Sequence, residues 1–209
     1  YFVRQAFFAV CGIGAMWVLS TWNYQVWRSF SFVILGVSIL FLMAVPLIGD
    51  SGGGATRWIQ VGPIRFQPSE LAKIGMVLTF ATLMSAWKDR MHTFRYGVVP
   101  FVGIMGVIAV LLYLQPHLSA TMIIMFVGVI MMFLGGTRLR WIFAIAGAVI
   151  GAGCLLVLVS EYAQARVETW LFIEQADPLG EAWQTLQGLM AIGSGGFFGV
   201  GLGNSRQKF

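Results

Sequence analysis

The chain has 209 residues, of which 58% are hydrophobic and 10% are charged. Soluble globular domains have about 25% charged residues, so this composition argues against a soluble enzyme, a disordered chain and a nucleic-acid-binding protein. The 13 basic and 8 acidic residues give a formal net charge of +5. Because the basic residues are scattered singly between long apolar runs, the positive charge is typical of a membrane protein.

Six stretches are apolar enough and long enough to cross a membrane, which takes about 20 residues. We therefore predict an all-α, polytopic membrane protein with six transmembrane helices in this chain. They are expected at residues 5–27, 29–49, 68–87, 96–116, 118–137 and 141–160. Cys11 and Cys154 fall inside apolar runs, so we interpret them as buried small apolar side chains and not as a disulfide or metal pair.

The connections between these helices predict the orientation of the chain. The short loops KDRMHTFR and TRLR are strongly basic, and basic residues concentrate on the cytoplasmic side of membrane proteins. Residues 50–67 and 161–209 then form external loops of a single transmembrane domain covering residues 1–209, and the turn at 115–117 is external too. Because Tyr1 is not an initiator methionine, we expect a fragment of a longer protein.

The external tail contains the segment EAWQTLQGLMAIG, whose apolar residues follow helical spacing. This pattern predicts an amphipathic helix on the outer leaflet, with Gln187 among its polar points. The glycine-rich run IGSGGFFGVGLG overlaps its end. That run fits neither the Walker nor the dinucleotide-binding pattern, so we favour a tight, close-packed turn over a phosphate-binding loop.

The segment richest in polar groups is RWIQVGPIRFQPSELAK, which runs from Arg57 to Lys73. Only 14 uncharged residues separate Lys73 from Lys88, about 21 Å of helix, which is too short to cross an apolar core of about 30 Å. The helix must therefore begin near Pro68, a favoured first-turn residue. This start places Glu70 and Lys73 at the outer edge of the membrane and on one helical face, where they can pair.

Two interpretations of this pair stay open. Glu70 and Lys73 form a structural ion pair, or they belong to a polar site open to the outside. We favour the second, because ionisable residues in membrane spans commonly serve function. Arg57 and Arg65, together with a lysine, suit a diphosphate or a carboxylate. Trp58 is either a membrane anchor or a stacking surface for a sugar or lipid.

Three further polar residues have weaker interpretations. Arg4 either joins the cationic set or extends its side chain to the membrane surface. Gln67 lies within the same crowded segment. His117 lies in a turn between two expected helices, where a single histidine is more often inert than functional.

Three motifs occur in order along nearly the whole chain: RWIQVGPIRFQPSELAK, QPHLSAT and DPLGEAWQTLQGLMAIGSGGFFGVGLGNSRQK. With these motifs the chain resembles the SEDS family (shape, elongation, division and sporulation). The resemblance implies a protein of ten spans, of which this fragment would run from the second to the external loop after the seventh. The closing GLGNSRQK is more similar to the FtsW/SpoVE division and sporulation branch than to the RodA elongation branch.

The resemblance implies a peptidoglycan glycosyltransferase in the cytoplasmic membrane of a bacterium, active at the external face. Such proteins polymerise lipid II, a disaccharide-peptide on undecaprenyl diphosphate. They work with a class B penicillin-binding protein and with other division or elongation proteins of the membrane. The expected partners therefore include membrane lipid but no nucleic acid. No cofactor is evident, and a divalent cation stays open.

The resemblance also implies roles for single residues. It implies substrate-binding positions at Arg4, Arg57, Trp58, Arg65, Gln67 and Gln187, and supporting catalytic positions at Glu70 and Lys73. The family's catalytic aspartate is expected in a stretch beyond Phe209. The family's usual QPD motif reads Gln115-Pro116-His117 here, so an imidazole replaces a carboxylate.

The chemistry of glycan polymerisation suggests how these residues would act. We expect Arg57, Arg65 and Arg4 to neutralise the departing diphosphate. Lys73 would share this role, with Glu70 holding it in position. Glu70 as the catalytic base is a lesser hypothesis, because an adjacent lysine makes a carboxylate a weaker base.

Two other classes of function stay open from the sequence. One is a flippase or transporter of lipid-linked precursors, and the other is a non-catalytic scaffold of the wall-synthesis machinery. No internal repeat is visible, and the polar groups lie at one face of the membrane rather than at its midplane, which disfavours transport. A scaffold would not need the charged residues between Arg57 and Lys73.

Overall fold

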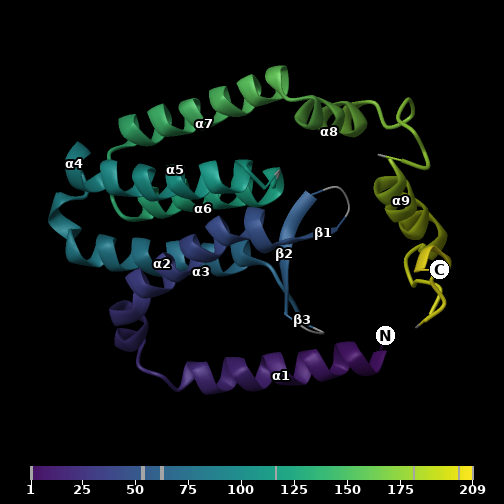
Figure 1. Ribbon diagram of the computed structural model, residues 1–209, viewed down its shortest axis with the longest axis horizontal. Helices are drawn as coiled ribbons and strands as arrows, with labels where there is room; N and C mark the ends of the chain where they lie inside the picture. The colour runs from purple at the N-terminus through teal and green to yellow at the C-terminus, as the bar shows by residue number, and fades with distance from the viewer. Residues whose placement is uncertain are drawn as a thin grey trace. The chain divides into compact units, whose positions relative to one another are not determined.

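The computed structural model describes residues 2–52, 55–61, 64–115, 117–180, 182–201 and 203–208. These residues form helices and one small antiparallel sheet (Figure 1). The chain divides into two compact units, Tyr1–Gly147 and Ala148–Phe209.

The helices of the first unit follow the predicted apolar stretches. They are α1 (Phe2–Ser20), α2 (Tyr24–Ile48), α3 (Pro68–Ala86), the 3-10 turn η1 (Lys88–Arg90), α4 (Phe94–Gly97), α5 (Val99–Tyr113), α6 (Leu118–Leu134) and α7 (Leu139–Val159), which continues into the second unit. The predicted all-α class is therefore confirmed, with a helix in each of the six expected places.

The number of membrane crossings stays a prediction. Among the described residues, four helices are long and apolar enough to span: α1, α2, the α4–α5 pair (Phe94–Tyr113) and α7. Helix α6 is apolar but shorter, with 17 residues. Helix α3 has 19 residues and carries a charged pair in its first two turns. These helices make the chain a multi-pass membrane protein.

The first predicted helix, residues 5–27, is wrong at its end. Helix α1 stops at Ser20, and α2 begins at Tyr24. The break occurs because Asn23 is the N-cap of α2: its side-chain oxygen accepts a hydrogen bond from the backbone N–H of Gln25, at 3.0 Å. Asparagine is among the favoured N-cap residues, so the boundary has a local cause that the apolar pattern hides.

The predicted external loop at 50–67 contains a three-stranded antiparallel sheet. Its strands are β1 (Asp50–Gly52), β2 (Ala55–Val61) and β3 (Ile64–Phe66), in the order β1-β2-β3. In the register of β2 and β3, Gln60 lies opposite Arg65. Their side chains join across the strands, because Arg65 Nε donates to Gln60 Oε1 at 3.2 Å.

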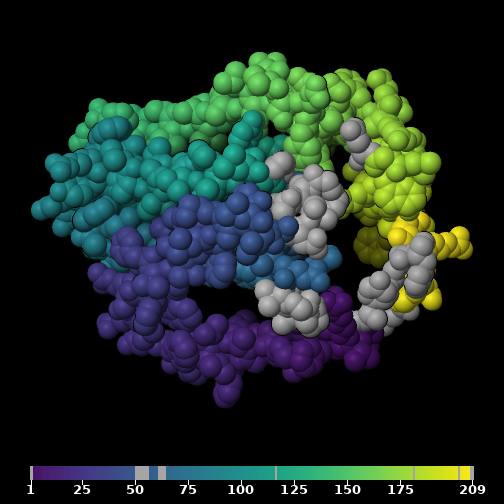
Figure 2. All heavy atoms as spheres, in the orientation of Figure 1, coloured from purple at the N-terminus to yellow at the C-terminus, as the bar shows by residue number. Residues whose placement is uncertain are grey.

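The core of the first unit lies between α2, α3, α5 and α6, which run side by side (Figure 1). Their side chains form a continuous mass in the space-filling view (Figure 2). Phe80 and Phe101 meet edge to face at the centre, with ring centroids 4.7 Å apart. Helices α2 and α3 approach closely because Gly75 faces the Leu35 backbone, where an added Cβ would lie 3.0 Å from the Leu35 Cα.

The two ends of this bundle differ in character. At one end, the Thr137 hydroxyl donates to the Gly97 carbonyl at 3.1 Å, and Phe94 packs on Trp141. These contacts bring the two basic loops together. The sheet lies at the other end of α2 and α3 (Figure 1). This separation agrees with the predicted alternation of the loops.

A proline inside α2 leaves a backbone carbonyl without its helical donor, and a side chain at the end of α5 satisfies it. Pro46 has no N–H, so the carbonyl of Leu42 loses its helical donor. Leu42 is fully buried, and an unpaired carbonyl there would be costly. The Gln115 side chain, itself buried, donates to this carbonyl at 2.8 Å. The hydrogen bond joins the end of α5 to the last turns of α2.

The two cysteines are not buried as predicted. Cys11 and Cys154 are free and exposed. They lie on α1, in whose described length no side chain is buried, and on α7, whose only buried described residue is Ile142. The apolar runs were correctly identified, but these two helices leave most of their surface uncovered by the rest of the described chain.

The second unit contains the predicted tail helix and one that was not expected. Helix α9 (Trp183–Gly195) confirms the helix predicted from EAWQTLQGLMAIG, and its place on the outer leaflet stays a prediction. Helix α8 (Glu161–Leu171) precedes it, and the short 3-10 turn η2 (Arg206–Lys208) follows it.

The glycine run is a series of turns, but it is not close-packed as predicted. Gly196, Gly199, Gly201 and Gly203 all have positive φ, which disfavours any residue with a Cβ. An added Cβ at Gly196, Gly199 or Gly203 would meet no atom of the described residues within 4 Å. The glycines are therefore required by the backbone conformation and not by tight packing.

We predict that Gly97 cannot accept a side chain. A Cβ at this position would overlap the Met91 carbonyl oxygen, so Gly97→Ala should destabilise the full-length protein by about 1–3 kcal/mol. Gly103 on α5 is the matched control, because a Cβ there meets nothing within 4 Å. Gly103→Ala should be neutral or slightly stabilising. Thermal unfolding in detergent compares the two, and equal midpoints would contradict the packing at Gly97.

A double-mutant cycle tests the repair of the Pro46 defect. Gln115→Met leaves the buried Leu42 carbonyl unpaired and should cost about 1–3 kcal/mol of stability. In a Pro46→Ala background the loss should shrink, because the new residue supplies a helical N–H to Leu42. Denaturation of the four proteins gives the coupling energy. An equal cost of Gln115→Met in both backgrounds would show that Gln115 serves another purpose.

Candidate functional site

The polar residues singled out in the sequence gather where the sheet enters α3. Arg57 and Trp58 lie on β2, Arg65 lies on β3, and Gln67 is the N-cap residue of α3. Trp58 is 37% exposed, and Arg57 is half-buried. The local fold that brings them together is the antiparallel pairing of β2 with β3, which runs directly into the helix.

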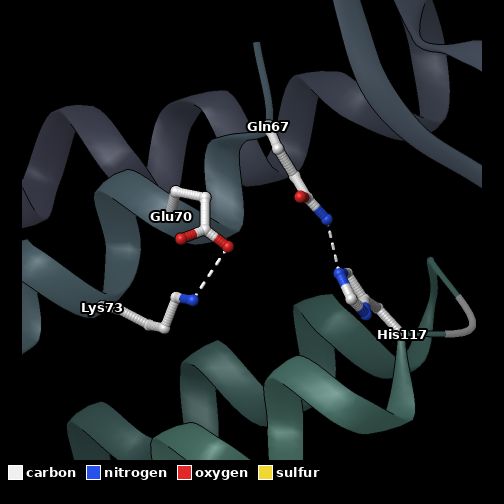
Figure 3. Close-up of polar contacts among 4 residues, drawn as sticks. All are labelled: Gln67, Glu70, Lys73 and His117. Carbon is white, nitrogen blue, oxygen red and sulfur yellow. Dashed lines mark hydrogen bonds and ion pairs between the residues drawn. The ribbon is translucent and has the colours of Figure 1, made fainter. Parts of the chain in front are cut away.

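Glu70 and Lys73 form the ion pair that their spacing predicts. Lys73 Nζ lies 2.8 Å from Glu70 Oε1, on one face of α3 (Figure 3). The helix begins at Pro68, as expected from the short apolar run after Lys73. Glu70 therefore lies in the first turn, where the positive end of the helix dipole favours a carboxylate. The pair is accessible, with the Lys73 side chain 28% and that of Glu70 58% exposed.

A contact that the sequence did not predict joins α3 to the turn before α6. The Gln67 side chain does not cap its own helix; its amide nitrogen meets the His117 Nε2 atom (Figure 3). An amide nitrogen can only donate, so this ring nitrogen accepts and carries no proton. The imidazole is then neutral, with its proton on Nδ1. This contact adds His117 to the candidate site.

The surroundings of His117 keep its ring neutral. Burial lowers the pKa of the imidazole below its usual range, and the nearby positive charges of Arg57 and Lys73 lower it further. The carboxylate of Glu70 acts in the opposite direction and raises the pKa. The net pKa is lowered, which agrees with a ring that accepts a hydrogen bond from Gln67.

Two of the predicted site residues lie on other helices. Arg4 lies on α1 and is exposed, with its guanidinium over the Phe8 ring of the same helix, 5.8 Å from the centroid. Gln187 lies half-buried on α9, in the second unit. Their roles in substrate binding stay predictions.

The site contains both positive and negative side chains, and its described residues include no cluster of metal ligands. Across the described ranges, no group of three or more histidine, cysteine, aspartate or glutamate side chains could hold a metal ion. The segment from 50 to 73 carries three cations, Arg57, Arg65 and Lys73, and two carboxylates, Asp50 and Glu70, so its net positive charge suits an anion. A divalent cation stays open.

The fold and this polar cluster define a class of protein: a polytopic helical membrane protein with a cationic site at one end of its bundle. The family described as "Cell cycle protein", which comprises FtsW, RodA and SpoVE, matches residues 1–209. The chain therefore belongs to the FtsW/RodA/SpoVE family, which is the SEDS family.

Curated relatives favour the FtsW/SpoVE branch. A "Probable peptidoglycan glycosyltransferase FtsW" of Trichlorobacter lovleyi is 36% identical over 211 residues, covering 100% of this chain and 55% of the relative. One from Geobacter sp. (strain M18) is 34% identical, with 98% and 56% covered. "Stage V sporulation protein E" of Bacillus subtilis is 34% identical, with 99% and 57% covered. The chain thus spans a little over half the length of these relatives.

Solved structures have the same fold. A chain of a peptidoglycan synthase complex, solved to explain how polymerization and crosslinking are coordinated, superimposes with a TM-score of 0.71 at 29% identity. The match covers 93% of this chain and 57% of that chain. The rod shape determining protein RodA of Thermus thermophilus gives a TM-score of 0.62 at 24% identity, with 90% and 62% covered.

The residues just before α6 make two contacts that the sequence does not predict. His117 is expected to be inert, yet it meets Gln67, and Gln115 donates to the Leu42 carbonyl. One clue to Gln115 was present: Pro46 falls inside a predicted span and must leave a carbonyl unpaired. No local pattern could identify the partner of His117, because it lies 50 residues earlier in the chain.

We predict that the ion pair contributes little to stability. Both side chains are accessible to solvent, and exposed ion pairs are worth less than about 1 kcal/mol. Glu70→Gln should therefore leave the thermal unfolding midpoint of the full-length protein nearly unchanged. A large drop in the midpoint would instead make the pair a structural element, the alternative that the sequence left open.

Proposed function

We propose that this chain is part of a peptidoglycan glycosyltransferase that polymerises lipid II into glycan strands during cell division or sporulation. The observation that carries the proposal is a set of cations at one end of an apolar bundle: Arg57 and Lys73 both lie near His117, and Arg65 lies on the neighbouring strand. Relatives that are 34–36% identical over nearly the whole chain have the name of that activity.

The reaction joins two sugars and releases a lipid diphosphate. An acceptor 4-hydroxyl oxygen bonds to the anomeric carbon of the donor, and the bond from that carbon to the diphosphate oxygen breaks. The electron pair leaves with the diphosphate, and the hydroxyl proton passes to a base. A site for this reaction needs cations at the diphosphate and a base at the hydroxyl.

The described residues supply the cationic half of this requirement. Arg57 and Arg65 offer guanidinium groups, which suit phosphate oxygens, and Lys73 adds a compact positive charge. Glu70 holds Lys73 in place through the 2.8 Å ion pair. The base is expected to be an aspartate in the stretch after Phe209.

The position of the cluster suits a substrate that is half lipid and half sugar. The sheet that carries the arginines contacts the apolar helices α2 and α3 through β2. The basic loops at the opposite end favour the cytoplasm, which supports our proposal that the cluster lies at the external face of the bacterial plasma membrane. Lipid II reaches that face with its sugars in water and its tail in the bilayer.

The proposed partner is a class B penicillin-binding protein, which would cross-link the strands. The support is the similarity to a chain of a peptidoglycan synthase complex that couples polymerization with crosslinking. Precursor flipping and scaffolding are weaker alternatives. The polar groups at one end of the bundle, rather than at its middle, disfavour a transporter, and a scaffold would not need the cations.

A polymerisation assay tests the proposal. The full-length protein, with its transpeptidase partner, is incubated with labelled lipid II, and glycan chains are resolved on a gel. Arg57→Ala should slow polymerisation roughly 100-fold by removing charge stabilisation of the leaving diphosphate. Glu70→Gln should also reduce the rate, because Lys73 loses its positioning partner.

Arg28→Ala is the matched control, because Arg28 is an exposed arginine near the start of α2, at the opposite end from the sheet. It should polymerise like the parent. Glycan chains from the parent and the control, but few from the two cluster variants, are the expected result. No chains from a folded parent would favour precursor flipping or scaffolding instead.

A further inference from the structure

The sheet segment that carries Arg57 and Arg65 is attached to the bundle at two points. It begins after the last turn of α2, and it ends at Gln67, the N-cap residue of α3. The position of both arginines relative to the membrane helices depends on how firmly these two attachments are held.

Gln115 and His117, which lie just before α6, make one contact at each of these two attachments. Gln115 donates to the carbonyl of Leu42, in the last two turns of α2. His117 meets Gln67 at the start of α3 (Figure 3). The two contacts are made from positions 73 and 50 residues away along the sequence, so they fix tertiary and not local structure.

Backbone hydrogen bonds hold Gln115 and His117 at a fixed separation. The N–H groups of Gln115 and His117 both donate to the Leu112 carbonyl, at 3.2 and 3.1 Å. Leu112 is fully buried in the core between α5 and α6. Gln115 and His117 are therefore both anchored to the core through the backbone of Leu112.

The hydrogen bonds made by Gln115 and His117 respond differently to pH. The amide of Gln115 does not titrate near neutral pH, so its bond is permanent. The imidazole of His117 accepts from Gln67 only while its Nε2 atom lacks a proton. A protonated ring would present a donor to the Gln67 amide nitrogen, and its positive charge would face Arg57 from β2 and Lys73 from α3. Glu70 on α3 is the one opposing charge among the described groups acting on the ring.

We infer that Gln115 and His117 form a two-point clamp on the arginine-bearing sheet, and that His117 is a positioning residue that works only as the neutral imidazole. The clamp would hold Arg57 in place relative to Lys73, so that both cations reach one diphosphate. Protonation of His117 releases one point of the clamp and makes the site inactive. This inference rests on the proposed function for its effect on catalysis, whereas the clamp itself is a structural claim.

The pH dependence of polymerisation by the full-length protein and its partner tests the clamp. The parent rate should fall about tenfold for each pH unit below the pKa of the ring. His117→Gln offers a neutral acceptor that cannot be protonated, so it should keep activity and lose the acidic limb. Above the pKa of the ring, where the parent is fully clamped, His117→Ala should be at least about tenfold slower than the parent, because the sheet is held at one point only.

His92→Gln is the matched control, because His92 is an exposed histidine in the basic loop. It should keep the parent's pH profile. An acidic limb that persists in His117→Gln, or parent-like rates in His117→Ala, would overturn the role of His117.

A second measurement is independent of catalysis. In the full-length protein with isotope-labelled histidine, the resonance lost in His117→Gln identifies the ring, and its titration gives the pKa. Gln67→Leu should raise that pKa, because the neutral ring loses the donor that stabilises it. An unchanged or lowered pKa would refute the contact. If no variant makes glycan, the proposed function fails while this titration still decides the clamp.

Discussion

Pro46 leaves the Leu42 carbonyl of α2 without its helical donor, and the apolar bundle offers no water to replace it. The hydrogen bond from Gln115 satisfies that carbonyl and ties the end of α5 to the end of α2. The arrangement of the polar end of the bundle follows from this tie. The same stretch of chain continues to His117, which meets the start of α3, so the sheet between α2 and α3 is held at both of its ends.

The charges at this end have little to do with holding the fold together. The Glu70–Lys73 pair is accessible, and Arg65 bonds to Gln60 at the surface of the sheet. Exposed interactions of this kind contribute little to stability. The net positive charge of the segment from 50 to 73 nevertheless favours a role in binding an anion. A lipid diphosphate meets both requirements, because its charge suits the cations and its tail suits the helices.

The sequence was sufficient where the cause was local. The start of α3 at Pro68 followed from the length of the apolar run after Lys73, and the ion pair followed from helical spacing. The sheet was missed because strands of three to seven residues are too short for a clear alternating pattern. The contacts of Gln115 and His117 could not be predicted, because each partner is chosen by tertiary packing.

The proposed function requires the arginine-bearing sheet and α3 to bind a lipid diphosphate together. The most direct test is the affinity of the full-length protein for undecaprenyl diphosphate in detergent, compared between the parent, Arg57→Ala and the distant Arg28→Ala. Only Arg57→Ala should bind the diphosphate more weakly than the parent. The same substitution should weaken the binding of undecaprenyl monophosphate less, because the monophosphate has fewer charges to neutralise. Equal affinity of all three proteins for the diphosphate would contradict the proposed function.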